Sequence, residues 1–231
     1  MRQERRFDSS EAMAAALAES IALELSEAIA SRGHASLVVS GGRTPVLMFD
    51  HLARARLAWN KVTVTLADER LVPATDADAN ERLVRDHLLQ NEAERAVFLP
   101  LWQGEGDPVE SALEAVSAMN RPFDVVLLGI GEDGHFASLF PRMPGLAAAL
   151  DPASVSLAVF IEDAGARHPR VSLTLAALMD ARLIFLSFAG TAKREVFERA
   201  MQPGPPEDLP IRAVLRQNAV PVDVYWSAVW A

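Results

Sequence analysis

One histidine in the middle of the chain stands in a loop whose composition suits acid–base chemistry. His135 follows Gly-Ile-Gly-Glu-Asp-Gly at residues 129–134, directly after the strand-like run 124–128. Three of these preceding residues are glycines, so packing in the core gives little reason for a histidine here. Imidazole gains and loses a proton near neutral pH. Asp133, two residues earlier, could orient the ring or tune its basicity. The pattern therefore favours a catalytic histidine supported by Asp133 over a structural one.

The same loop also matches the Gly-x-Gly-x-x-Gly pattern of dinucleotide-binding turns. However, Glu132 and Asp133 stand where a pyrophosphate would have to bind. Pro141 and Pro144 interrupt any long helix after the loop. We therefore do not interpret the pattern as a dinucleotide site.

A second glycine-rich turn, Ser-Gly-Gly-Arg-Thr-Pro, occupies residues 40–45. Gly41 and Gly42 would let the backbone approach a ligand closely, and the final proline suits the first turn of a helix, whose free N–H groups favour an anion. An ordinary strand-to-helix turn explains these residues equally well. Binding of a substrate phosphate by this turn, with Arg43 and Thr44, is thus one of two open interpretations.

Charged residues follow two further strand-like runs. Asp68, Glu69 and Arg70 come soon after Val62–Leu66, and Lys193 follows a Gly-Thr-Ala segment that begins a predicted helix. Either segment could bind polar groups of a ligand. A solvated loop and a helix cap with a surface lysine are the plainer alternatives. Because ligands of open parallel sheets bind beyond the carboxyl ends of the strands, all four segments would face one crevice.

Short apolar runs alternate with helical patterns along the chain. This alternation predicts one α/β domain over residues 1–231, Rossmann-like, with a mostly parallel sheet flanked by helices. Strands are expected at residues 36–40, 62–66, 124–130, 155–160, 182–188 and 223–229. Helices are expected at residues 9–31, 45–56, 79–90, 108–119, 173–179, 191–201 and 210–217.

The first helix has the clearest signals at both ends. Asp8 and Glu11 have the spacing of a capping box, with Asp8 in place of the usual Ser or Thr. Apolar residues then recur at every fourth position from Leu17 to Ile29 and give the helix one apolar face. Gly33 is a suitable stop signal.

Composition excludes several classes of protein. The chain has 231 residues, half of them hydrophobic, no cysteine and a formal net charge of -9. Disulfides and thiolate chemistry are excluded, and a general nucleic-acid surface would need a basic face. Residues 1–8 lack the apolar run of a secretory signal, and no stretch is long enough to span a bilayer. We expect a cytoplasmic protein without nucleic-acid or membrane partners.

The same segments, taken in order, resemble the 6-phosphogluconolactonase family. The similar blocks are residues 40–45, 68–70, 72–73, 78–80, 129–135, 137–141, 170–174, 190–193 and 209–210. The resemblance implies the fold of glucosamine-6-phosphate deaminases and ribose-5-phosphate isomerases. It also implies hydrolysis of 6-phospho-D-glucono-1,5-lactone, the second step of the oxidative pentose phosphate pathway. Two departures are Arg43, where the family often has serine, and Asp76, where it often has histidine.

Residue roles follow from the resemblance at the matching positions. It implies that His135 is the base for attack by water on the lactone carbonyl, supported by Asp133. The residues implied to hold phosphate and sugar oxygens are Gly41, Gly42, Arg43, Thr44, Arg70, Arg170 and Lys193. Asp68 is a further candidate for substrate binding. No metal or cofactor is expected, because no two histidines have the spacing of a helical metal site and a lactone carbonyl is already electrophilic.

Two other functions remain as alternatives. A sugar-phosphate isomerase or deaminase of the same fold also uses a Gly-x-Gly-x-Asp-Gly-His loop. Residues 137–141, Ala-Ser-Leu-Phe-Pro, resemble the lactonases instead. A non-catalytic sugar-phosphate sensor would usually add a DNA-binding segment, for which one helix before the first strand leaves no room. The expected partner is a small sugar-phosphate lactone, and the chain is expected to be a monomer or a weak homodimer.

Overall fold

The two central strands of the fold are largely apolar and buried along their whole length. Every residue of β2 (Ala35–Val39) and of β6 (Phe123–Leu128) is buried. Such strands are typical of parallel sheets that helices cover on both faces. The structure, a computed structural model, describes residues 3–162, 165 and 167–229.

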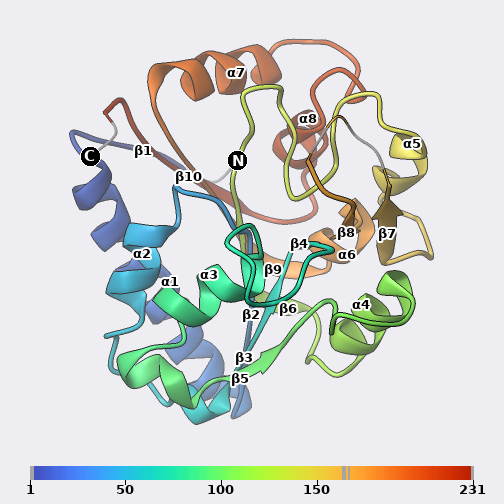
Figure 1. The fold of residues 1–231 in the computed structure, drawn as a ribbon. Coiled ribbons are helices and arrows are strands. Elements are labelled where there is room, and N and C mark those ends of the chain that lie inside the picture. Colours follow the sequence, from blue (N-terminus) through green and yellow to red (C-terminus); the bar gives the residue numbers. More distant parts are fainter. Residues whose placement is uncertain (1–2, 163–164, 166, 230–231) are drawn as a thin grey trace.

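Seven strands form the main sheet of the described chain, and all their pairings are parallel. Their order is β1-β10-β9-β6-β2-β3-β5 (Figure 1). The remaining members are β1 (Gln3–Phe7), β3 (Val62–Leu66), β5 (Val97–Leu99), β9 (Ala181–Ala189) and β10 (Val222–Ser227). From β2 the chain builds outward through β3 and β5, and from β6 it builds the other way through β9 and β10. The α/β class and the mostly parallel sheet expected from the sequence are confirmed.

Three short strands form a second, antiparallel sheet. Its order is β4 (Asp68–Arg70), β8 (Arg170–Leu173) and β7 (Ala158–Ile161). Two expectations are wrong here: residues 68–70 are a strand and not a loop, and the strand expected at 155–160 lies outside the main sheet. The reason is tertiary pairing, since three-residue β4 exists through its ladder with β8, which aligns Arg70 with Arg170.

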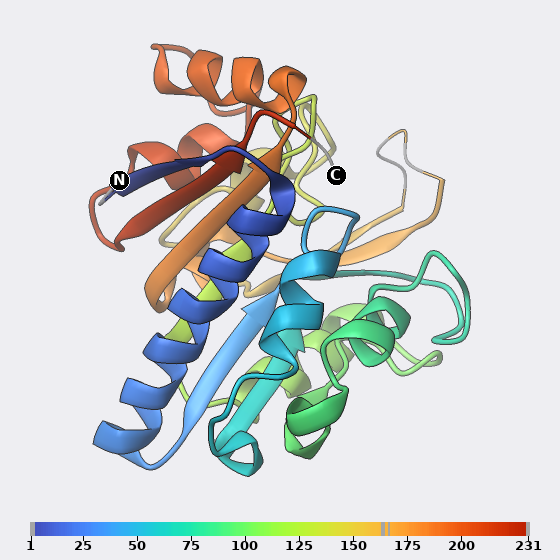
Figure 2. The same cartoon turned by 90° about the vertical axis from the view of Figure 1, so that its left-hand side faces the viewer.

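Helices cover both faces of the main sheet. The longest are α1 (Ser10–Arg32), α2 (Val46–Leu52), α3 (Asn80–His87), α4 (Pro108–Ser117) and α7 (Thr191–Met201). Shorter ones are α5 (Leu146–Ala149), α6 (Leu175–Met179), α8 (Ile211–Arg216) and the 3₁₀ turns η1 (Trp59–Lys61) and η2 (Asn91–Arg95). Helices α1, α2 and α3 lie on one face, and α4, α6 and α8 with the small sheet lie on the other (Figures 1 and 2).

Most expected elements exist, with ends shifted by a few residues. Helix α7 and strand β3 have the predicted bounds. The sequence did not reveal β1 and β5, the two edge strands, or β8. Strand β1 consists of Gln-Glu-Arg-Arg-Phe, and its charged side chains suit an edge of the sheet but hide the strand from hydropathy. It also precedes α1, so the expectation that only a helix precedes the first strand is wrong.

Helix α1 begins one residue later than the capping-box spacing predicts. Ser9, not Asp8, is the N-cap, and its hydroxyl accepts a hydrogen bond from the Ala12 N–H at 3.1 Å. The predicted stop is confirmed: Gly33 has a left-handed backbone with φ of 82°, and its N–H donates to the Ile29 carbonyl. Serine is the better cap here because its hydroxyl reaches the third residue of the helix.

Among the described residues, no helix has the length and apolar character needed to cross a bilayer.

The N-cap assignment can be tested by unfolding. Replacing Ser9 with Ala should lower the free energy of unfolding by about 1 kcal/mol, because the amino end of α1 loses a hydrogen-bond acceptor. Asp8→Ala should have a clearly smaller effect, since its side chain does not cap the helix. Urea unfolding of both variants measures this, and a larger loss in Asp8→Ala would contradict the assignment.

Candidate active site

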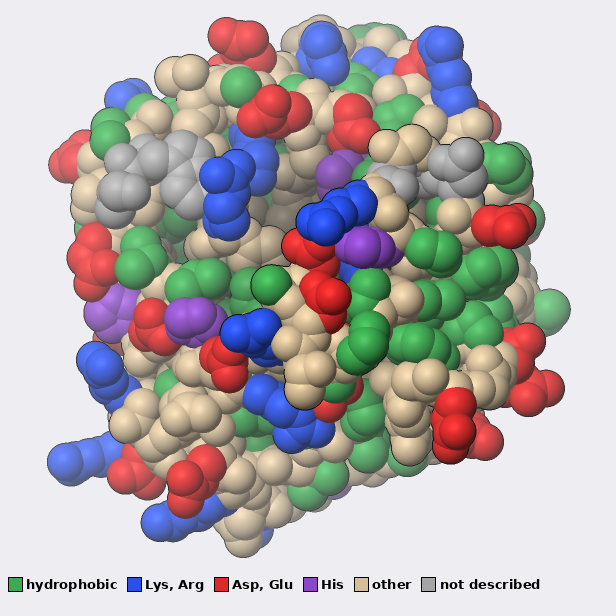
Figure 3. Space-filling view, in the orientation of Figure 1, with side chains coloured by type: hydrophobic (Ala, Val, Ile, Leu, Met, Phe, Trp, Pro, Cys, Tyr) green, Lys and Arg blue, Asp and Glu red, His purple; other side chains and the backbone are tan. Residues whose placement is uncertain are grey.

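A cavity of about 170 Å³ lies at the carboxyl ends of the central strands. It opens where the chain runs in opposite directions from β2 and β6, which are neighbours in the sheet. Open parallel sheets bind ligands at this kind of position. Figure 3 shows a hollow on this face with basic and histidine side chains at its border.

The cavity brings together nearly all the predicted site residues. It is lined by Gly41, Gly42, Arg43, Thr44, Asp68, Arg70, His135, Arg170 and Lys193. Asp133 does not line it and instead contacts it through His135. Four separate chain segments and β8 thus meet in one place, as the argument from strand ends predicts.

His135 is held by its own loop. Its Nδ1 lies 2.6 Å from Asp133 Oδ1, and its backbone N–H donates to the same oxygen at 3.1 Å. Because an ionised carboxylate only accepts hydrogen bonds, Nδ1 carries the proton and Nε2 keeps a free lone pair. The imidazole is about one-third exposed, so Nε2 belongs to a ring that solvent and ligands can reach.

His135 stabilises the ionised form of Asp133. Burial acts to raise the pKa of this carboxyl, but the hydrogen bond and charge of His135 outweigh burial and hold the pKa below its ordinary value. The carboxylate therefore stays ionised and can accept the hydrogen bond from Nδ1. This is the arrangement that a general base needs while it holds a proton taken from water.

Close packing in this loop depends on Gly131. A Cβ atom at that position would lie 2.2 Å from His135 Nδ1 and 2.6 Å from Asp133 Oδ1. Any side chain there would displace the pair. On another side of the imidazole, the Phe140 ring lies 4.5 Å away between centroids.

Asp68 has protein partners inside the cavity wall. It is 4% exposed, accepts a hydrogen bond from the Ser138 hydroxyl at 2.5 Å, and lies 3.7 Å from an Arg170 nitrogen. Burial lowers the pKa of Arg170, and the charge of Asp68 partly opposes this. Ser138 is a residue that sequence reasoning missed, although it lies in the segment 137–141 that resembles the lactonases.

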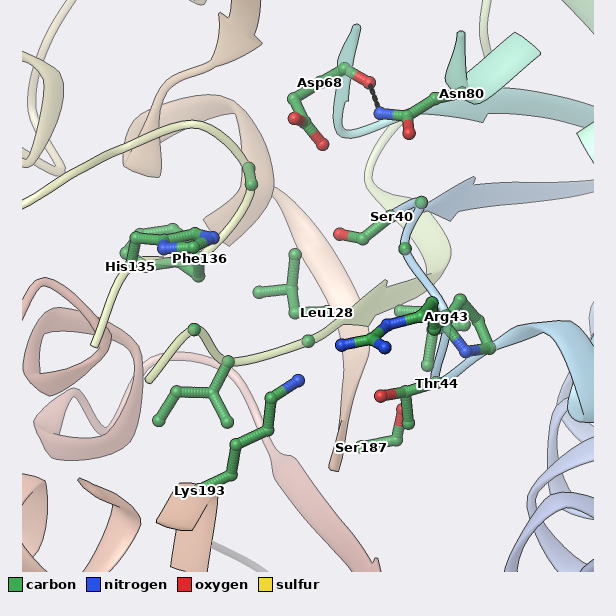
Figure 4. Close-up of a pocket in the computed structure, with 18 of the residues that line it drawn as sticks. Ser40, Arg43, Thr44, Asp68, Asn80, Leu128, His135, Phe136, Ser187 and Lys193 are labelled. Carbon is green, nitrogen blue, oxygen red and sulfur yellow. Dashed lines mark hydrogen bonds between the residues drawn. The ribbon is translucent and has the colours of Figure 1, made fainter. Parts of the chain in front are cut away.

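Cationic side chains converge on the cavity from different elements. Lys193, in the first turn of α7, and Arg43, in the glycine turn, both extend into it (Figure 4). Burial lowers the pKa of Lys193, the charge of Glu132 opposes that effect, and the charge of Arg43 adds to it. Arg70 donates to the Asp78 carbonyl and Arg170 lies beside Asp68. A chain with net charge -9 thus places four cations around one cavity.

Sequence reasoning also missed polar residues at the back of the cavity. Ser40, Asn80 and Ser187 line it, and all three are buried. Asn80 lies in the block 78–80 that carried part of the resemblance, which was the one available signal. Nothing in the sequence marks Ser187, which lies within strand β9.

Glu69 lies behind this wall, on the other side of β4 from Asp68 and Arg70. Its carboxylate accepts hydrogen bonds from the N–H groups of Arg70 at 2.6 Å, Asn80 at 2.8 Å and Glu81 at 2.6 Å. Burial raises the pKa of this carboxyl to about 7, against the effect of the three hydrogen bonds and with a small contribution from the charge of Asp68.

Within the described ranges, no group of three or more His, Cys, Asp or Glu side chains is arranged to hold a metal ion.

Comparison with known proteins identifies the family. The model of the family described as glucosamine-6-phosphate isomerases/6-phosphogluconolactonase matches residues 8–226. The chain belongs to this family. Proteins named 6-phosphogluconolactonase include one from Rhizobium meliloti, 44% identical over 96% of this chain and 97% of its own length. Another from Mesorhizobium japonicum is 46% identical over 93% of this chain and 91% of its own.

Solved structures of the family agree with the fold. A 6-phosphogluconolactonase from Shewanella baltica is 42% identical, superposes with a TM-score of 0.93, and the match covers 99% of this chain and 98% of that one. A monomeric glucosamine-6-phosphate deaminase has a TM-score of 0.76 at 19% identity, over 96% of each chain, and so shows the fold alone. The family resemblance and the expected similarity to the deaminase fold are both confirmed.

The raised pKa of Glu69 predicts how stability depends on pH. The folded carboxyl binds its proton more tightly than the unfolded one, whose pKa is near 4.5. The folded state is therefore favoured at low pH, and that advantage, about 3 kcal/mol, is lost as pH rises from about 4.5 to about 7.

Urea unfolding of the wild type and of Glu69→Gln, at about pH 5 and about pH 8, isolates this contribution. The wild type should lose stability relative to the variant as pH rises, because glutamine does not titrate. A constant difference between the two proteins across this range would show that the folded pKa is not raised.

Proposed function

We propose that this chain hydrolyses 6-phospho-D-glucono-1,5-lactone to 6-phospho-D-gluconate in the oxidative pentose phosphate pathway. The observation that carries the proposal is a histidine–aspartate pair at the edge of a cavity that four cationic side chains surround. The histidine supplies a base and the cations suit a phosphorylated substrate. Relatives of nearly full length that are named 6-phosphogluconolactonase support this choice of lactone.

In the proposed reaction, His135 acts on a water molecule. Its Nε2 removes a proton as the water oxygen attacks the lactone carbonyl carbon, and Asp133 stabilises the resulting imidazolium through the bond to Nδ1. General-base assistance of this kind contributes roughly 10²- to 10⁴-fold to the rate. The carbonyl is already electrophilic, so no covalent enzyme intermediate is needed.

Attack by water places negative charge on the carbonyl oxygen. Backbone N–H groups of the glycine loop that carries His135 and the neighbouring cations are the available donors, and each well-placed donor is worth about 3 kcal/mol. The tetrahedral intermediate then collapses and breaks the bond to the ring oxygen. His135 returns its proton to that oxygen, which leaves as the hydroxyl of the open-chain acid.

The cations position the substrate. A phosphate dianion offsets the repulsion among Arg43, Arg70, Arg170 and Lys193, which the free cavity must tolerate. Binding at the phosphate end holds the carbonyl carbon near His135. The free energy of phosphate binding thereby orients the lactone for attack.

The overall proposal is tested by a lactone-opening assay corrected for spontaneous hydrolysis. The phosphorylated lactone should be opened far faster than unphosphorylated gluconolactone, because the cations act only on the former. Equal rates on both would remove the role of the phosphate. Ammonia release from glucosamine 6-phosphate would instead identify a deaminase.

Removal of the base should abolish most of the activity. His135→Ala is expected to lower kcat by roughly 10²- to 10⁴-fold, with folding retained. His51→Ala is a matched control, because His51 pairs with Glu11 at 2.7 Å on the surface of α2 and does not line the cavity. Steady-state kinetics and circular dichroism measure both variants. A folded His135→Ala with near wild-type kcat would disprove the base assignment.

Removal of a cation should weaken binding more than chemistry. Lys193→Ala and Arg170→Ala are each expected to raise KM about tenfold or more, because a charged hydrogen bond to substrate is lost. Lys61→Ala, at the opposite end of β3, serves as the control. An unchanged KM in both cavity variants would exclude these two residues from substrate binding.

A further inference from the structure

Asn80 begins helix α3 and is buried against the back of the cavity. Its side chain is 1% exposed, and the residue forms part of the cavity lining. The amide Nδ2 donates to the Asp68 backbone carbonyl at 2.8 Å (Figure 4). This bond sets the orientation of the amide, because only the nitrogen end can donate to a carbonyl. Oδ1 therefore points away from β4.

The other side of the amide meets the glycine turn. A Cβ atom on Gly41 would lie 1.9 Å from Asn80 Oδ1 and 2.4 Å from its Cγ. Among the described residues, Oδ1 has no hydrogen-bond partner. The Asn80 amide thus packs directly against the Gly41 backbone and leaves no space for a side chain there.

This contact explains why position 41 is glycine. Gly42 has a left-handed backbone with φ of 98°, which itself favours glycine, whereas Gly41 is not among the residues with positive φ. Alanine would fit the backbone at position 41. What excludes it is the Asn80 side chain.

The backbone of Asn80 is held by the buried carboxylate of Glu69. The N-cap residue of α3 is Ala79, which offers no side-chain acceptor to the first N–H groups of the helix. The buried Glu69 carboxylate takes that place by accepting from Asn80 and Glu81. Helix α3 therefore starts at a position set by β4, which also carries the cavity residues Asp68 and Arg70.

We propose that Asn80 is a positioning residue, which holds the glycine turn at a fixed separation from β4 and so sets the width of the ligand cavity. The proposal rests on the proposed function for the identity of the ligand. Asn80 joins two segments that each supply substrate contacts, Gly41 to Thr44 on one side and Asp68 with Arg70 on the other. Loss of its amide lets the two sides separate, which raises KM while kcat changes little.

A double-mutant cycle tests the contact. Gly41→Ala and Asn80→Ala are each expected to raise KM for the phosphorylated lactone by about tenfold or more, because ligand groups are displaced from their partners. The double variant should be no worse than Asn80→Ala, since the smaller side chain leaves room for the new methyl group. Values of kcat and the pH profile of kcat should change little, because the His135 loop is untouched.

Gly129→Ala provides the matched control. Gly129 lines the same cavity, but a Cβ there would meet only the Ser187 carbonyl, at 3.9 Å. Gly129→Ala should change KM by the same factor in the wild type and in the Asn80→Ala variant. Asn80→Leu covers the case in which the alanine variant does not fold, because it keeps a side chain of similar shape, adds no charge and loses the donor to Asp68. It too should raise KM at nearly constant kcat.

Three outcomes would overturn the proposal. One is additivity of Gly41→Ala and Asn80→Ala. Another is a fall in kcat at constant KM, the sign of a smaller folded fraction and of a merely structural role. The third is an unchanged KM in Asn80→Leu. If the wild type opens no lactone, the proposed function fails by itself, and the same cycle is then measured on binding of 6-phosphogluconate by calorimetry.

Discussion

The hydrogen bond between Asp133 and His135 is the interaction on which the candidate site depends. It forms only because the backbone at Gly131 carries no side chain and lets both groups fold back over it. The bond determines which imidazole nitrogen carries the proton, and therefore which one keeps the lone pair that the proposed mechanism uses. In the proposed mechanism, the other residues of the site bring a substrate to that nitrogen.

The parallel sheet provides the common edge. Strands β3, β2, β6 and β9 are consecutive neighbours, so the segments that follow them converge although they are far apart in the sequence. This convergence also solves an electrostatic problem. An acidic chain repels an anionic ligand in general, yet four cations gathered at one edge make a local positive region. The lowered pKa values of Lys193 and Arg170 reflect the burial that accompanies this arrangement.

Much of this could be predicted from the sequence because it is encoded locally. Apolar runs, glycine turns and charged strand ends reveal the sheet, the crevice and most of the cavity lining. Contacts that depend on distant pairing could not be predicted. Strand β4 exists through its ladder with β8, and Ser138 reaches Asp68 across 70 residues of sequence. Glu69 looked like one charge of a solvated triplet, and only the fold shows that it is buried.

Strand β4 faces two environments with only three residues. Asp68 and Arg70 belong to the cavity, whereas Glu69 anchors α3 on the opposite side. Since side chains alternate along a strand, inserting or deleting one residue here would exchange the two sides. The Glu69 carboxylate would then point into the cavity, and the Arg70 side chain would point into the protein interior. A change in the length of this segment would therefore alter the cavity and the start of α3 at once, whereas a substitution at one position alters only one of them.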